Sequence, residues 1–297
     1  MNTTSLTGRR ALVLGGGGST GNAWLIGVVA GLADTGLDVT DADLTIGTSA
    51  GSTAAVQFAG AAPSDLYRQA TTAQATTPDR SHASRPAPNR PVTTHLDRFR
   101  AIIADSVDAD EMRRRMGAAA LGLEATSDGT WPATWRSTVA ARLPVDVWPE
   151  RDIAITAVDA ATGEPVVFDR TSGVDIADAV AASCSSSLPF PIGDGRFIDG
   201  GYRRNENADL AAGHERVLVL APFGGRTMHP LAWGMQLAAQ VEELRAGGSR
   251  VETVFPADED EHLFGSNAMR PALRPEAARA GHRLGAALAE RLGAFWR

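Results

Sequence analysis

The amino-acid sequence predicts an α/β fold with a mostly parallel sheet, because apolar strands repeatedly run into a glycine-containing loop and then a helix. A strand at 9–14 leads into four glycines, Gly15 to Gly18, and then into a helix at 22–34. A second apolar strand, at 43–46, ends in Gly47-Thr48-Ser49-Ala50-Gly51, and a helix of small residues follows. Strand, turn and helix in succession are typical of parallel sheets covered by helices.

Length and composition are those of a globular protein that can bury a substantial core. The 297 residues are 43% hydrophobic and 21% charged, and the net charge of −7 argues against a general nucleic-acid binder. The single cysteine, Cys184, excludes an internal disulfide and a multi-cysteine metal site. Residues 1–10 contain no apolar run, and no segment approaches the roughly 20 apolar residues of a spanning helix. We expect a cytoplasmic protein without metal or cofactor, and its oligomeric state stays open.

Periodicity and turn residues predict the remaining elements of a single domain, residues 1–297. The segment at about 76–95 holds four prolines among serine, histidine, arginine and asparagine, and we expect a mobile loop there. A helical insertion at about 96–141 follows it. The expected helices lie at 51–61, 63–75, 96–104, 109–123, 132–141, 176–182, 230–246 and 275–296. The expected strands lie at 152–159, 165–168, 195–202, 216–220 and 250–255.

The last of these helices carries Leu284, Leu288 and Leu292 on one face. An apolar stripe of this kind usually packs into a core, and transient contact with a membrane surface is the minority interpretation.

Three loops that follow strands combine the groups needed for acyl transfer. In a mostly parallel sheet, strand ends of this kind meet along one edge. Ser49 supplies a nucleophile at a sharp strand–helix bend, which Gly47 and Gly51 permit because they lack Cβ atoms. Asp199, in Asp199-Gly200-Gly201, can act as a base. The backbone N–H groups of Gly16, Gly17 and Gly18 can hold an oxyanion.

Two other functions fit parts of the sequence. Gly16-x-Gly18-x-x-Gly21 fits a dinucleotide-binding fingerprint, but the second strand ends in Gly47-Thr48-Ser49 instead of the acidic residue that binds the ribose. An α/β-hydrolase with a Ser-Asp-His triad requires a histidine late in the chain. The histidines that qualify by position are His214, His229, His262 and His282. Such hydrolases place several strands before the elbow and this chain has one clear strand there, which favours a dyad.

Taken together, the motifs resemble those of the patatin-like phospholipase family. They occur in the family's order, as Gly16-Gly17-Gly18-Ser19-Thr20-Gly21, Gly47-Thr48-Ser49-Ala50-Gly51 and Asp199-Gly200-Gly201, and residues 182–191 resemble its proline-bearing segment. The resemblance covers roughly residues 9–220. It implies a three-layer α/β/α sandwich, a Ser49–Asp199 dyad and hydrolysis of lipid or other acyl esters. Thr20 departs from the pattern, because the family has a basic residue there.

Overall fold

The computed structural model describes residues 8–72 and 93–297. Most of the predicted loop at 76–95 therefore lies outside the described residues, and its last three residues already belong to a helix that begins at Thr93.

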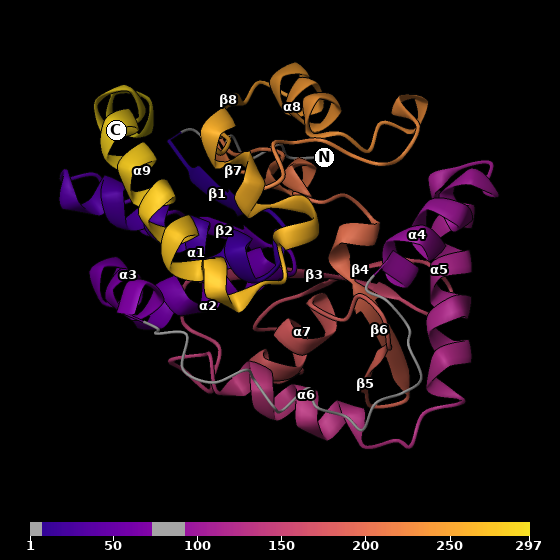
Figure 1. Ribbon diagram of the computed structural model, residues 1–297. Coiled ribbons are helices and arrows are strands. Elements are labelled where there is room, and N and C mark those ends of the chain that lie inside the picture. The colour runs from indigo at the N-terminus through magenta and orange to yellow at the C-terminus, as the bar shows by residue number, and fades with distance from the viewer. Residues whose placement is uncertain (1–7, 73–92) are drawn as a thin grey trace.

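A single mixed sheet organises the described part of the chain, in the order β5-β6-β3-β2-β1-β7-β8, with β4 paired to β3 (Figure 1). The strands are β1 (Arg10–Leu14), β2 (Leu44–Gly47), β3 (Asp152–Asp159), β4 (Pro165–Phe168), β5 (Phe190–Ile192), β6 (Gly195–Asp199), β7 (Arg216–Leu220) and β8 (Arg250–Val254). The pairs among β3, β2, β1, β7 and β8 are parallel, and β4, β5 and β6 join in antiparallel register. The sheet is thus mostly parallel, as predicted.

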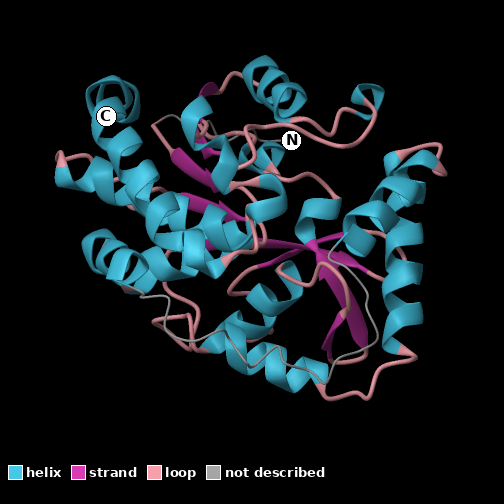
Figure 2. Ribbon diagram, viewed as in Figure 1, coloured by secondary structure: helices cyan, strands magenta, loops and turns pink. Residues whose placement is uncertain are grey.

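Helices cover both faces of this sheet, which makes a three-layer α/β/α sandwich (Figure 2). They are α1 (Gly18–Asp34), α2 (Ala50–Gly60), α3 (Pro63–Thr72), α4 (Thr93–Ala104), α5 (Ala109–Glu124), α6 (Trp131–Ala140), α7 (Ile176–Ser183), α8 (Leu237–Ala246) and α9 (Arg274–Trp296). Alternate residues of β1 point to opposite faces. Leu12 and Leu14 join the core under α1 and α9, whereas Ala11 and Val13 join the core under α8.

The C-terminal helix α9 packs on α1 so closely that their backbones touch. A Cβ atom added to Gly27 of α1 would lie 2.0 Å from the carbonyl oxygen of Ala278. Leu292 is fully buried, and Leu284 and Leu288 pack half-buried against the same core. The apolar stripe of α9 is therefore core, in line with the favoured interpretation. None of the helices in the described residues combines the length and the apolar character needed to cross a membrane.

The helix expected at 22–34 begins earlier, at Gly18, so the last glycine of the loop is already its first residue. Three further predicted elements differ from the observed ones. The helix expected at 230–246 begins only at Leu237, because Gly234 adopts a left-handed φ of 64° and ends a short 3₁₀ turn before it. The strand expected at 195–202 stops at Asp199, where the chain turns into a 3₁₀ turn over Gly200–Tyr202. The proline-bearing segment contains a short strand, β5, that pairs with β6.

Candidate active site

The bend between β2 and α2 holds Ser49 in a strained backbone conformation. Its φ of 53° and ψ of −115° lie in a region that residues other than glycine rarely adopt. Gly51 is required beside it, since a Cβ atom there would lie 1.9 Å from the carbonyl oxygen of Leu14 on β1. The N–H of Ser49 donates to Ser183 Oγ at 2.9 Å, which ties the bend to the end of α7. The bend thus presents the serine hydroxyl at the carboxyl edge of the sheet.

Asp199, at the end of β6, lies against that hydroxyl. Ser49 Oγ donates to Asp199 Oδ2 at 2.8 Å, and the other carboxylate oxygen accepts from the N–H of Gly201 at 2.8 Å. Asp199 is buried, with 9% of its surface exposed. Burial raises the pKa of Asp199 to about 6, against the opposing hydrogen bonds from Gly201 and Ser49. The structure therefore joins the two side chains that the sequence proposes as nucleophile and base.

The glycine loop reaches the same edge from β1. The N–H of Gly16 donates to the carbonyl oxygen of Asn205 at 3.0 Å, and Gly18 has a left-handed φ of 64°. The carbonyl of Gly17 accepts from the N–H of Gly21 at 3.0 Å in the first turn of α1. Because β1 pairs with β2 as far as Leu14 and Gly47, the glycine loop and the serine bend start side by side.

A buried polar cluster joins the serine bend to the loop that follows Asp199. Thr48 Oγ1 lies 2.9 Å from Thr156 Oγ1 of β3. The Asn207 amide lies within hydrogen-bonding distance of both hydroxyls, at 3.0 and 3.3 Å, and donates to the carbonyl of Gly200 at 3.2 Å. Asn207 is fully buried. The sequence analysis missed it, because a polar residue in a run of polar residues looks like solvated surface. The cluster couples the serine bend to the Asp199 loop.

Cys184 lies near Asp199, and its thiol is not activated. Its Sγ is 3.7 Å from Ser52 Oγ and 3.8 Å from Thr53 Oγ1. Burial, together with the nearby charge of Asp199, raises the pKa of the thiol to about 11. A thiol of that pKa carries almost no thiolate at neutral pH, so it cannot compete as a nucleophile.

Thr20, which replaces the family's basic residue, is fully buried in the first turn of α1. Its N–H donates to the carbonyl of Ala268 at 3.0 Å. The guanidinium of Arg274 donates to this turn, to the carbonyl of Ser19 at 2.6 Å and to Asn22 Oδ1 at 3.0 Å. A threonine at position 20 therefore serves packing, and positive charge reaches the loop from α9.

The four candidate histidines have partners other than Ser49 and Asp199. His214 Nδ1 contacts the carbonyl of Ala211, and His229 Nδ1 contacts Thr227 Oγ1. His262 pairs with Glu276, and His282 with Asp34. Burial lowers the pKa of His229 to about 4. Across residues 8–72 and 93–297, none of these four side chains hydrogen-bonds to Ser49 or Asp199.

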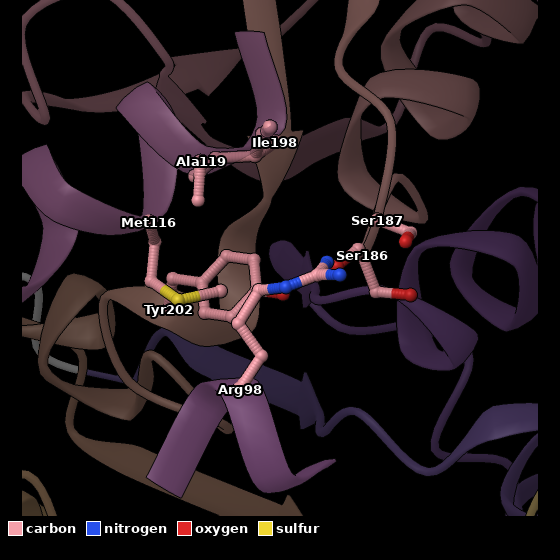
Figure 3. Close-up of a pocket in the computed structure, with 8 residues that line it drawn as sticks. Arg98, Met116, Ala119, Ser186, Ser187, Ile198 and Tyr202 are labelled. Carbon is pink, nitrogen blue, oxygen red and sulfur yellow. The ribbon is translucent and has the colours of Figure 1, made fainter. Parts of the chain in front are cut away.

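A small cavity of about 10 Å³ lies behind the Asp199 loop, between α4, α5 and residues 186–187 (Figure 3). Tyr202 lines it and donates to the carbonyl of Ser186 at 2.5 Å, while Arg98 points in from α4. Burial, together with the charge of Asp199, raises the pKa of Tyr202. The cavity has room for about one water molecule, so it fits no acyl chain.

Comparison with known proteins places these features in a family. The sequence model of patatin-like phospholipases matches residues 12–212, whereas a search of curated proteins finds no match. The crystal structure of VipD from Legionella pneumophila is 14% identical with a TM-score of 0.44, covering 95% of this chain and 67% of VipD. The type III effector ExoU is 18% identical with a TM-score of 0.42, covering 95% of this chain and 53% of ExoU. A structure of ExoU with SpcU, from Pseudomonas aeruginosa, gives a TM-score of 0.39 at 18% identity, covering 95% of this chain and 52% of ExoU.

The chain therefore spans about half the length of ExoU. The family match extends from β1, through the glycine loop and the serine bend, to the segment beyond Asp199. Because that match covers well over half of the sequence, the chain belongs to the patatin-like phospholipase family.

Proposed function

We propose that this protein is a serine lipid acyl hydrolase that uses Ser49 as nucleophile and Asp199 as its only general base. The observation that carries the proposal is the 2.8 Å hydrogen bond from Ser49 Oγ to Asp199 Oδ2 at a strained strand–helix bend. The membership of a phospholipase family favours an ester of a lipid as the substrate.

The proposed reaction follows from the hydroxyl proton of Ser49, which points at Asp199. Ser49 Oγ attacks the ester carbonyl carbon while Asp199 Oδ2 takes the hydroxyl proton. The tetrahedral oxyanion then collapses to an acyl-serine, and the proton passes from Asp199 to the departing alkoxide. Water repeats the sequence in the second half-reaction and releases the acid. With a pKa near 6, Asp199 is ionised at neutral pH and is a stronger base than an exposed aspartate.

For the oxyanion, we propose the N–H groups of Gly17 and Gly18. The N–H of Gly16 is already held by Asn205, whereas no acceptor for the other two is found among the described residues. The N-terminus of α2, directly after Ser49, adds a favourable dipole for the anionic intermediate. Met269, which is 69% exposed and adjoins Gly18, offers an apolar surface at the rim for an acyl chain.

Labelling with a serine-reactive fluorophosphonate, followed by mass-spectrometric mapping, tests the nucleophile. We expect one adduct, on Ser49, and hydrolysis of p-nitrophenyl esters and of phospholipid vesicles. Ser49→Ala should abolish both signals, and Ser186→Ala, which changes an exposed serine of the neighbouring loop, should abolish neither. An adduct on Ser52, Ser185 or Ser186 would contradict the proposal.

A further inference from the structure

Asn205 holds both polar groups of Gly16 in the glycine loop. Its carbonyl oxygen accepts from the N–H of Gly16 at 3.0 Å, and its side-chain Nδ2 donates to the carbonyl of Gly16 at 3.2 Å. The two residues are 189 positions apart in the chain, so these two hydrogen bonds join the first strand–helix connection to the segment after Asp199. Within the part of the chain that the structure describes, Asn205 is the only side chain that hydrogen-bonds to the Gly16 carbonyl.

Because of the geometry of the peptide bond, these hydrogen bonds also fix the direction of the N–H of Gly17. A trans peptide is planar, and its C=O and N–H point in opposite directions. The carbonyl of Gly16 and the N–H of Gly17 belong to the same peptide unit. When Asn205 holds that carbonyl, the N–H of Gly17 must face the opposite side of the loop.

We propose that Asn205 is a positioning residue, which orients the Gly17 N–H toward the oxyanion by anchoring the Gly16 carbonyl. The inference rests on the proposed function, since it deepens the role of the same site. A run of four glycines has more conformational freedom than any other sequence of that length, so an external anchor is needed to fix one peptide orientation.

A second contact fixes the anchor itself. Asn205 Nδ2 also donates to Glu206 Oε1 at 2.9 Å, and Glu206 is 1% exposed. One amide nitrogen therefore serves two acceptors, which leaves the side chain a single orientation. There is no spare room around it, because a Cβ atom on Gly16 would lie 2.7 Å from Asn205 Oδ1.

The test compares Asn205→Ala and Asn205→Asp with a neighbouring control, Arg204→Ala. Both variants of Asn205 keep the backbone acceptor and lose the Nδ2 donor, and Asp also keeps the size of the side chain. Arg204 pairs with Asp209 and Glu243, away from the glycine loop, so its loss changes stability without touching Gly16. Thermal unfolding of each variant reports its folding.

We expect kcat/KM for a p-nitrophenyl ester to fall roughly ten- to a hundredfold in both Asn205 variants, with KM little changed. The upper end of this expected loss matches the lower end of the range of about 10²–10³ that is typical of losing one oxyanion donor. Affinity for a trifluoromethyl ketone should fall in parallel, because its serine adduct places an oxyanion in the same position. Arg204→Ala should keep the kcat/KM of the wild type.

Normal kcat/KM in a folded Asn205→Ala, or an equal loss in Arg204→Ala, would overturn the positioning role. Failure of both Asn205 variants to fold would overturn it too, because Asn205 would then be a structural residue. If the wild type neither hydrolyses esters nor labels at Ser49, the proposed function itself is wrong, and the inference falls with it.

Discussion

Replacing Asp199 by asparagine should abolish activity and stabilise the protein above pH 6. The amide has the shape of the carboxylate, and its oxygen can still accept from the N–H of Gly201. Its nitrogen then faces Ser49 Oγ and cannot take a proton. General acid–base catalysis typically contributes about 10²–10⁴-fold, so we expect kcat to fall by at least about 10².

The stability change follows from the pKa of Asp199. Burial holds this pKa at about 6 in the folded state, against an ordinary value of 3.8. The folded state therefore binds the proton more tightly than the unfolded state. The corresponding stability is fully present below pH 3.8 and is lost as the pH rises through 6. At ~1.4 kcal/mol per pKa unit, the loss at pH 8 is about 3 kcal/mol.

Asparagine carries no charge, so Asp199→Asn should escape this loss. Urea unfolding at pH 4 should give both proteins nearly the same free energy of unfolding. At pH 8 the variant should be more stable by up to about 3 kcal/mol. Other buried carboxylates titrate equally in both proteins, so the difference at each pH isolates Asp199. A difference that stays constant between pH 4 and pH 8 would refute the reasoning.

Three further predictions concern the surroundings of the dyad. Burial raises the pKa of Glu206 to about 7 from 4.5, so the stability that its proton contributes is lost as the pH rises through 7. In urea unfolding, Glu206→Gln should therefore raise the free energy of unfolding by up to about 3 kcal/mol at pH 8 and leave it unchanged at pH 4. Gly51→Ala should destabilise by about 3 kcal/mol or more, because its Cβ would overlap the Leu14 carbonyl; an unchanged midpoint would show that the bend can relax. Single alanine variants of His214, His229, His262 and His282 should keep near-normal kcat when folded, and a loss as complete as that of Asp199→Asn in any of them would favour a triad.

The regular elements could be predicted because their signals are local. The strands β1, β3 and β7 are short apolar runs that end in turn residues, and the observed bounds differ by at most one residue from the predicted ones. The helix expected at 230–246 is wrong in its first half, because Gly234 takes a conformation that periodicity does not register. The turns at 258–273 carry no periodic pattern, and no element was predicted there.

In the candidate site too, residues with a local signal could be predicted and residues without one could not. Ser49, Asp199 and the glycines stand out because each belongs to a short motif after a strand. Asn205, Glu206 and Asn207 do not, because their burial arises from contacts with segments far away in the chain. A run of Asn-Glu-Asn looks like surface until the fold places Asn205 against the glycine loop and Asn207 against the serine bend. The one available signal was its position shortly after Asp199-Gly200-Gly201, from which Tyr202, Arg203 and Arg204 separate it.

Thr20 shows how the structure changes an expectation drawn from the motif alone. The basic residue that the family's motif has at this position would add positive charge near the oxyanion. Because Thr20 is fully buried against Ala268, a longer side chain has no room there. We therefore expect Thr20→Arg to lose stability instead of gaining activity on anionic phospholipid.

The rate at which a fluorophosphonate labels Ser49 tests the central claim most directly, because it measures the nucleophile without a second half-reaction. Wild type, Asp199→Asn and the four histidine variants would be compared at pH 8, with the adduct mapped by mass spectrometry. The Ser49–Asp199 dyad predicts that labelling slows by at least about 10² in Asp199→Asn alone. Equal rates in wild type and Asp199→Asn would contradict it.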